Sequence, residues 1–171
     1  MVDYSDIVRF HGHECPGLAI GYRLALAAMG ELGVGHAGDE ELVAIVENDA
    51  CGVDALQMLS GCTFGKGNLV FRDHGKQVYT LFSRTSGRSV RALYHGRGMP
   101  RDLADDSLGR AAWILAAPEA EIVSLGPALL TVPEMARIRS SLPCGVCGEP
   151  VMEDRLRDGR CIPCSGSRVI S

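Results

Sequence analysis

The sequence predicts an α+β fold, in which helices pack on an antiparallel or mixed sheet, plus a small C-terminal zinc ribbon. Helix-like segments dominate the first third of the 171 residues, strand-like segments follow, and four paired cysteines lie near the end. The composition, 46% apolar and 22% charged, is typical of a globular domain with a substantial core. We expect a core domain over residues 1–140 and a ribbon domain over residues 141–171.

The first elements follow from apolar patterning. Residues 18–32 are rich in alanine and leucine and predict a helix that glycine ends. Residues 42–46 form a continuous apolar run, which favours a buried strand. A second helix is expected over residues 53–59, with Asn48 and Asp49 as its capping residues.

The middle of the chain turns to β signals. Residues 69–71, 78–82 and 90–94 predict antiparallel strands joined by short loops. The remaining segments predict a helix at 107–117, a last strand at 121–125, and a short helix at 133–138 that opens on proline.

Charge and cysteine content narrow the class of protein. A net charge of −4 gives no general case for nucleic-acid binding. No apolar run reaches the ~18–20 residues of a membrane-spanning helix, and the acidic N-terminus lacks a secretory signal. We therefore expect a cytoplasmic protein, whose seven cysteines are reduced thiols, metal ligands or redox groups rather than disulfides.

The C-terminal cysteines predict a structural zinc site. Cys144 and Cys147 form one C-x-x-C pair, Cys161 and Cys164 form another, and thirteen residues separate them. Two such turns supply the four thiolates of a tetrahedral zinc ion. The alternatives are two disulfides, free thiols, or a mononuclear iron with the same ligands. Residues 141–171 carry balanced charges and no aromatic residue, so protein contact or self-association is a better role for this segment than nucleic-acid binding.

A second metal site is predicted near the N-terminus. His11, His13 and Cys15 alternate along the chain, so an extended segment would present all three on one face. Cys51 follows the strand predicted at 42–46, where ligands often gather in α/β arrangements. Mixed histidine and cysteine ligands fit zinc or another late first-row metal. The alternative is that these cysteines act as small buried hydrophobic residues.

Two residues are candidates for catalysis. Cys15 precedes Pro16 at a predicted helix N-terminus, where the dipole lowers a thiol pKa and favours a nucleophilic thiolate. Lys66 lies in a glycine-rich loop, where it could contact an anionic substrate. The loop does not match a P-loop, and a plain connection into a strand is the alternative.

Three segments carry a family resemblance: HGHECPGLAIG at 11–21, ENDACGVDA at 47–55 and GCTFGKGN at 61–68. Together they resemble the formylmethanofuran dehydrogenase FmdE family. The resemblance implies an α+β core, a metal-binding His/Cys motif, a C-terminal zinc finger in longer members, and a homodimer. It draws attention to His11, His13, Cys15, Asn48, Cys51, Cys62 and Lys66.

Three functions compete. The first is a metal-dependent enzyme or accessory subunit of redox or one-carbon metabolism, in which His11, His13 and Cys51 bind metal. In that case Cys15 is a ligand or nucleophile, and Lys66 stabilises an anionic group of a small-molecule substrate. The second is a carrier that delivers a metal or metal cofactor to a partner enzyme. The third is a regulatory scaffold whose ribbon contacts another macromolecule. We favour the first.

Overall fold

The structure, a computed structural model, describes residues 2–128 and 134–166. The chain divides into two compact units, Met1–Met135 and Ala136–Ser171. In the described parts of the chain, no helix has the length and apolar character needed to cross a membrane.

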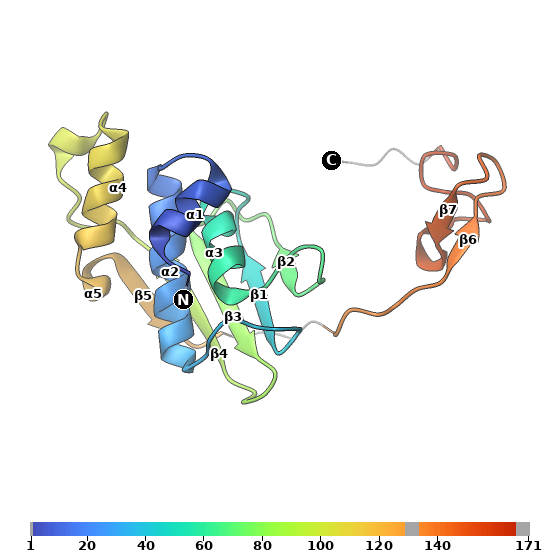
Figure 1. The fold of residues 1–171 in the computed structure, drawn as a ribbon, viewed down its shortest axis with the longest axis horizontal. Helices are drawn as coiled ribbons and strands as arrows, with labels where there is room; N and C mark the ends of the chain where they lie inside the picture. The colour runs from blue at the N-terminus through green and yellow to red at the C-terminus, as the bar shows by residue number, and fades with distance from the viewer. Residues whose placement is uncertain (1, 129–133, 167–171) are drawn as a thin grey trace. The chain divides into compact units, whose positions relative to one another are not determined.

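The larger unit is built on a five-stranded mixed sheet (Figure 1), which confirms the predicted fold class. Its strand order is β2-β1-β3-β4-β5. β1 and β2 run parallel, and the other neighbouring strands are antiparallel. The bounds are β1 Leu42–Val46, β2 Leu69–Phe71, β3 Val78–Ser83, β4 Ser89–Tyr94 and β5 Val123–Gly126.

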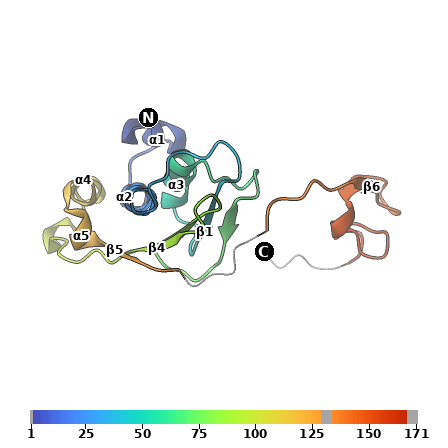
Figure 2. The ribbon, with the colours of Figure 1, turned by 90° about the horizontal axis from the view of Figure 1, so that it is seen from below.

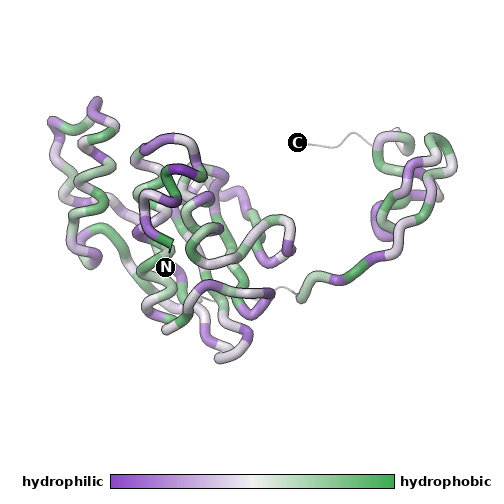
Figure 3. The backbone as a smooth tube through the Cα atoms, viewed as in Figure 1, coloured by the Kyte–Doolittle hydropathy of each residue, from purple (hydrophilic) through white to green (hydrophobic). Residues whose placement is uncertain are grey.

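Helices α1, α2 and α3 lie on one side of this sheet (Figure 2). The helix bounds are α1 Tyr4–His11, α2 Pro16–Leu32, α3 Gly52–Ser60, α4 Ser107–Ala116 and α5 Glu119–Ile122, with a 3-10 turn η1 at Arg101–Leu103. Apolar residues recur along these helices and strands (Figure 3). The core joins α2 to the sheet through side chains such as Leu18, Leu24, Tyr79 and Leu81, which are 0% exposed.

Two glycines bring α2 and α3 into backbone contact. A Cβ atom added at Gly21 would lie 2.1 Å from the carbonyl oxygen of Gly52 and 2.2 Å from its Cα. Any side chain would therefore push the helices apart at this crossing. Because Cys15 is the N-cap of α2 and Cys51 the N-cap of α3, the close crossing also brings the two cysteines together.

Several predicted elements need correction. The helix α1 was not expected; it begins with a capping box in which Asp3 and Asp6 bond each other's backbone N–H groups. β2 does not pair with β3 in the predicted antiparallel series; it pairs in parallel with β1, because α3 is a crossover between them. Residues 134–138, part of the last predicted helix, have no regular structure, and residue 133 lies outside the described residues.

The predicted capping of α3 is also wrong. Its N-cap is Cys51, and no side chain caps the helix by a hydrogen bond. Asn48 instead accepts a hydrogen bond from the N–H of Ala50, which turns the chain after β1.

The smaller unit is a short cysteine-rich module. Its two-stranded sheet pairs β6 Ser141–Pro143 with β7 Pro150–Met152, and the 3-10 turn η2 Glu153–Arg155 follows. An isolated bridge between Arg157 and Arg160 then returns the chain to the second cysteine pair.

Candidate metal centre and adjoining cavity

His11, His13 and Cys15 converge as predicted, but by a different local structure. Their ligand atoms all lie within 4.8 Å of one another. His11 is the last residue of α1, and Gly12 then turns the chain with a φ of 97° before Cys15 begins α2. A helix end, a left-handed turn and a helix start therefore replace the expected extended segment. Cys15 has the extended conformation expected before a proline, with φ −152° and ψ 161°.

The His11 ring is oriented by a carboxylate. Its Nδ1 atom lies 2.7 Å from Oδ2 of Asp54, in the first turn of α3. Nε2 of the same ring is buried and has no hydrogen-bond partner among the described residues. A carboxylate on one ring nitrogen fixes the tautomer that leaves the other nitrogen with a free lone pair. That arrangement is the one found behind histidines that bind metal.

Cys51 lies beside Cys15 and so adjoins the cluster of His11, His13 and Cys15. A Cβ atom added at Gly17 would be 3.8 Å from the Cys51 sulfur and 3.9 Å from the Cys15 sulfur. The Cys15 sulfur accepts a hydrogen bond from the N–H of Leu18 at 3.4 Å. Burial, followed by the hydrogen bond and charge interaction with Cys15, raises the pKa of the Cys51 thiol. The fold thus gathers His11, His13, Cys15 and Cys51 from three helix ends.

Two buried tyrosine hydroxyls border the cysteines, and neither has a hydrogen-bond partner among the described residues. The Tyr79 hydroxyl presses against Gly52, where an added Cβ would be 2.5 Å from its oxygen. Burial is the main cause that raises the pKa of Tyr79, and the charges of Asp54 and Cys51 add to it. Burial likewise raises the pKa of Tyr4 to about 12, with Glu14 and Cys15 as the nearby charges.

A cavity of about 410 Å³ opens next to His11 and Cys51. It lies where the parallel strands β1 and β2 end and α3 begins, the usual ligand position in strand–helix–strand units. Its volume is within the ~300–1,000 Å³ range of small-molecule sites. The lining residues are His11, Val46, Asn48, Asp49, Ala50, Cys51, Val53, Asp54, Phe64, Leu69 and Phe71.

Lys66 and Cys62 lie apart from this cluster. The Lys66 ammonium donates to the carbonyl oxygens of Ala37 and Asp39, at 3.3 and 3.4 Å, and Lys66 does not line the cavity. Cys62 is 0% exposed, and burial raises its pKa, as expected for a cysteine that packs as a hydrophobic residue. Of the predicted site residues, the structure therefore brings together His11, His13, Cys15 and Cys51.

The four C-terminal cysteines also converge. The sulfur atoms of Cys144, Cys147, Cys161 and Cys164 lie within 4.8 Å of one another and could hold a metal ion. The N–H groups of Val146 and Cys161 donate to the Cys144 sulfur at 3.4 and 3.3 Å. Backbone hydrogen bonds of this kind lower the pKa of Cys144 to about 6, which favours the thiolate that metal binding requires.

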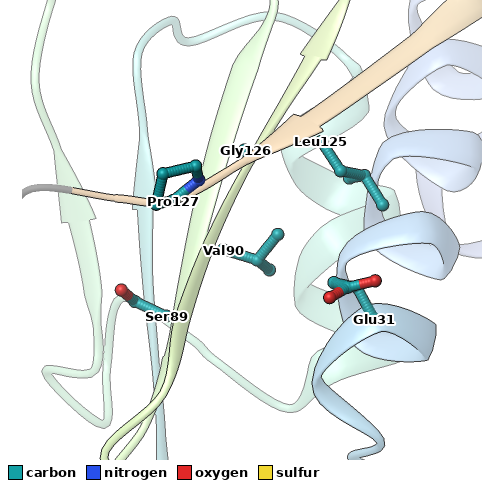
Figure 4. A pocket seen from close by; sticks show the side chains of 6 residues that line it. All are labelled: Glu31, Ser89, Val90, Leu125, Gly126 and Pro127. Atoms are coloured by element: carbon teal, nitrogen blue, oxygen red, sulfur yellow. The ribbon is translucent and has the colours of Figure 1, made fainter.

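A second cavity, of about 350 Å³, lies between the end of α2 and strands β4 and β5 (Figure 4). It is lined by Glu31, Ser89, Val90, Leu125, Gly126 and Pro127. Glu31 is the one ionisable group in this lining, and no imidazole or thiol is part of it. It lacks the convergence of reactive groups found beside His11.

Asp54, Tyr79 and the two phenylalanines that line the cavity, Phe64 and Phe71, were not predicted from the sequence. Asp54 lies three residues after Cys51, a spacing that places two residues on one face of a helix and could have indicated it. Tyr79 is one of several apolar residues in the strand Val78–Ser83, and nothing in that run marks it as part of a site. Phe64 and Phe71 lie on either side of a glycine-rich segment, and the sequence analysis attended to the lysine and glycines of that segment rather than to the aromatic residues.

Fold and site together define a class: an α+β protein with a mixed imidazole–thiol cluster beside a cavity and an appended four-cysteine module. Residues 10–131 match the family described as FmdE, molybdenum formylmethanofuran dehydrogenase operon, and the chain belongs to that family. A crystal structure of a tungsten formylmethanofuran dehydrogenase FmdE-like protein from Syntrophus aciditrophicus is similar to the whole chain. The two share a TM-score of 0.75 and 25% identity, over 96% of this chain and 93% of that chain.

A further relative comes from Archaeoglobus fulgidus and is described as a probable S-adenosyl-L-methionine-binding protein. It is 30% identical over 92% of this chain. The chain spans about half the length of that relative, 51%.

Proposed function

We propose that the core cluster is a metal centre that serves a metal-dependent enzyme or accessory subunit of redox or one-carbon metabolism. His11, through Nε2, His13 and Cys15 would be ligands, and Cys51 a fourth ligand or a neighbouring thiol. The observation that carries this proposal is the buried Nε2 of His11. It has no partner among the described residues, while Asp54 holds the opposite side of the ring.

The donor set indicates the metal. Two imidazoles with one or two thiolates suit zinc or another late first-row ion. Three protein ligands would leave a position for water or substrate, and a bound metal would supply Lewis-acid chemistry there. Beside it, Asp54 orients His11, and Cys51 faces the cavity that would hold a substrate. The family's association with formylmethanofuran dehydrogenase supports the one-carbon setting.

In the C-terminal module we propose a structural zinc ion, bound by four thiolates. A module of this size buries too little apolar surface to fold without one. Two of its cysteines, Cys144 and Cys161, are nearly buried, with 3% and 7% exposure.

Metal content tests both sites. Protein purified without added metal should contain two metal ions per chain. Cys15→Ser and Cys144→Ser should each lose one, and Cys62→Ser should keep both, because Cys62 lies outside both clusters. One metal ion per chain, lost only in Cys144→Ser, would reject the core centre.

A metal carrier is the second candidate, because His13 is exposed and gives the cluster contact with solvent. A carrier must exchange its cargo. Rapid transfer of the core metal to a competing chelator, with the ribbon metal retained, would favour the carrier. Slow exchange would favour an enzyme.

A further inference from the structure

The cavity beside the cluster has an aromatic wall that is left in water. Phe64, in the loop after α3, is 81% exposed, and Phe71, at the end of β2, is 49% exposed. Both line the cavity together with Leu69 and Val53. An exposed aromatic side chain forgoes the favourable free energy of burial, and faces of this kind stack on planar ligands.

The placement of Phe71 is fixed by the sheet. Phe71 pairs with Val46 across the parallel strands, and Leu69, two residues earlier, points to the same face. Val46 packs in the core under the helices, so Phe71 lies on the helix side of the sheet, at its edge. This wall therefore stands on a strand rather than on a loop alone.

The charged groups of the cavity set the charge of its ligand. Asp49 and Asp54 line it, and no lysine or arginine of the described residues does. Asp49 is exposed and makes no hydrogen bond or ion pair with the described residues, whereas Asp54 holds His11. Lys66, in the loop that also carries Phe64, donates its ammonium hydrogens to the carbonyl oxygens of Ala37 and Asp39. An anionic ligand would therefore meet the carboxylate of Asp49, which no basic side chain of this lining offsets.

We infer that this cavity binds a planar aromatic group, neutral or cationic, stacked on Phe64 and Phe71 with Asp49 facing any positive charge. This selects against the anionic substrate expected from the sequence. The inference rests on the proposed function only in placing the ligand beside the metal centre. Phe64, Phe71 and Asp49 are not among the proposed metal ligands of the core or of the C-terminal module.

Calorimetric titration with three probes tests the inference. Adenosine is a neutral nucleoside with a planar base, and 5′-AMP adds an anionic phosphate to it. S-adenosylmethionine instead adds a sulfonium-linked amino acid, whose sulfonium, ammonium and carboxylate groups leave the molecule with a net positive charge. Adenosine and S-adenosylmethionine should bind at one site per chain. 5′-AMP should bind at least about tenfold more weakly at low ionic strength, and the gap should shrink as salt screens the carboxylates. Asp49→Asn should narrow the same gap.

Matched variants assign the site. Phe64→Leu and Phe71→Leu should each weaken adenosine binding by about fivefold or more, the lower end of what stacking on one aromatic ring contributes. Phe10→Leu is the control, because Phe10 is 60% exposed on α1 and does not line the cavity. Binding unchanged in both cavity variants, 5′-AMP as tight as adenosine, or no binding of any probe would overturn the inference.

Sedimentation of the same samples covers the competing occupant. A dimer that Phe64→Leu or Phe71→Leu converts to monomer, with no probe bound, would mean that a second copy covers the wall, and the inference would fail. The core metal is quantified in parallel. Probe binding without core metal would reject the proposed metal centre alone, and core metal without probe binding would reject the ligand alone.

Discussion

Replacing Gly21 by alanine tests whether the close crossing of α2 and α3 builds the site. The added Cβ would lie 2.1 Å from the Gly52 carbonyl oxygen, whereas ordinary contacts begin near 3.4 Å. The helices must therefore separate by more than 1 Å, because the three nearest atoms all belong to the Gly52 backbone and cannot rotate away. Alanine gains about 1 kcal/mol of helix propensity over glycine, but overpacking a core costs about 1–3 kcal/mol or more.

We expect Gly21→Ala to lower the free energy of unfolding by about 2 kcal/mol, because a clash with backbone atoms puts the steric cost near about 3 kcal/mol, against about 1 kcal/mol gained in helix propensity. We also expect weaker binding of the core metal, since separation of the helices moves Asp54 away from His11 and Cys51 away from Cys15. Gly30→Ala is the matched control on the same helix, because nothing lies within 4 Å of its added Cβ. That variant should be more stable by up to about 1 kcal/mol.

Urea unfolding followed by circular dichroism measures the stability of both variants, and elemental analysis measures their metal content. If Gly21→Ala were stabilised as much as Gly30→Ala and kept its core metal, the role assigned to the crossing would be refuted.

Three further variants have distinct expected results. Burial raises the pKa of Glu47, but hydrogen bonds from His74 and Arg91 outweigh burial and lower it below the ordinary 4.5. The ionised Glu47 therefore stabilises the folded protein above pH 4.5, and this contribution is lost on acidification. Glu47→Gln should lower the free energy of unfolding by about 1–3 kcal/mol at pH 7. The urea midpoints of variant and wild type should converge as the pH falls below 4.5 and through the lowered pKa of Glu47. A difference that stays equal from pH 7 into that range would contradict this. Tyr79→Phe should leave the free energy of unfolding within about 1 kcal/mol of wild type. It should lower the affinity for the core metal about tenfold, as measured by competition titration with a chelator; an unchanged affinity would show that Tyr79 has a packing role alone. Cys144→Ser should lose the ribbon metal and make residues 141–166 sensitive to trypsin, by mass spectrometry of the fragments; a resistant module would show that it folds without metal.

The sequence predicted best where the signal is local. The long alanine-rich helix and the apolar run at 42–46 appear as α2 and β1, because periodicity and burial determine them directly. The helix α1 was not predicted because it has eight residues, of which only Ile7 is buried. Its capping box uses Asp6 where the usual pattern has glutamate or glutamine.

The pairing of β2, and the side chains that orient the proposed metal ligands, depend on contacts between residues far apart in the sequence. A strand, a helix and a strand in succession favour parallel pairing, and this rule applies to β1, α3 and β2. The contact between His11 and Asp54 joins residues 43 positions apart and arises only after Gly21 and Gly52 let the helices cross. The spacing of the donors could be seen in the sequence, whereas the groups that orient them required the fold.

Anomalous diffraction at the absorption edge of the bound metal, on crystals grown without added metal, tests the central claim most directly. We expect two anomalous peaks per chain. One should lie among the four cysteine sulfurs of the C-terminal module, and the other between Nε2 of His11, the His13 ring and the Cys15 sulfur. A single peak, confined to the C-terminal cysteines, would contradict a metal centre in the core.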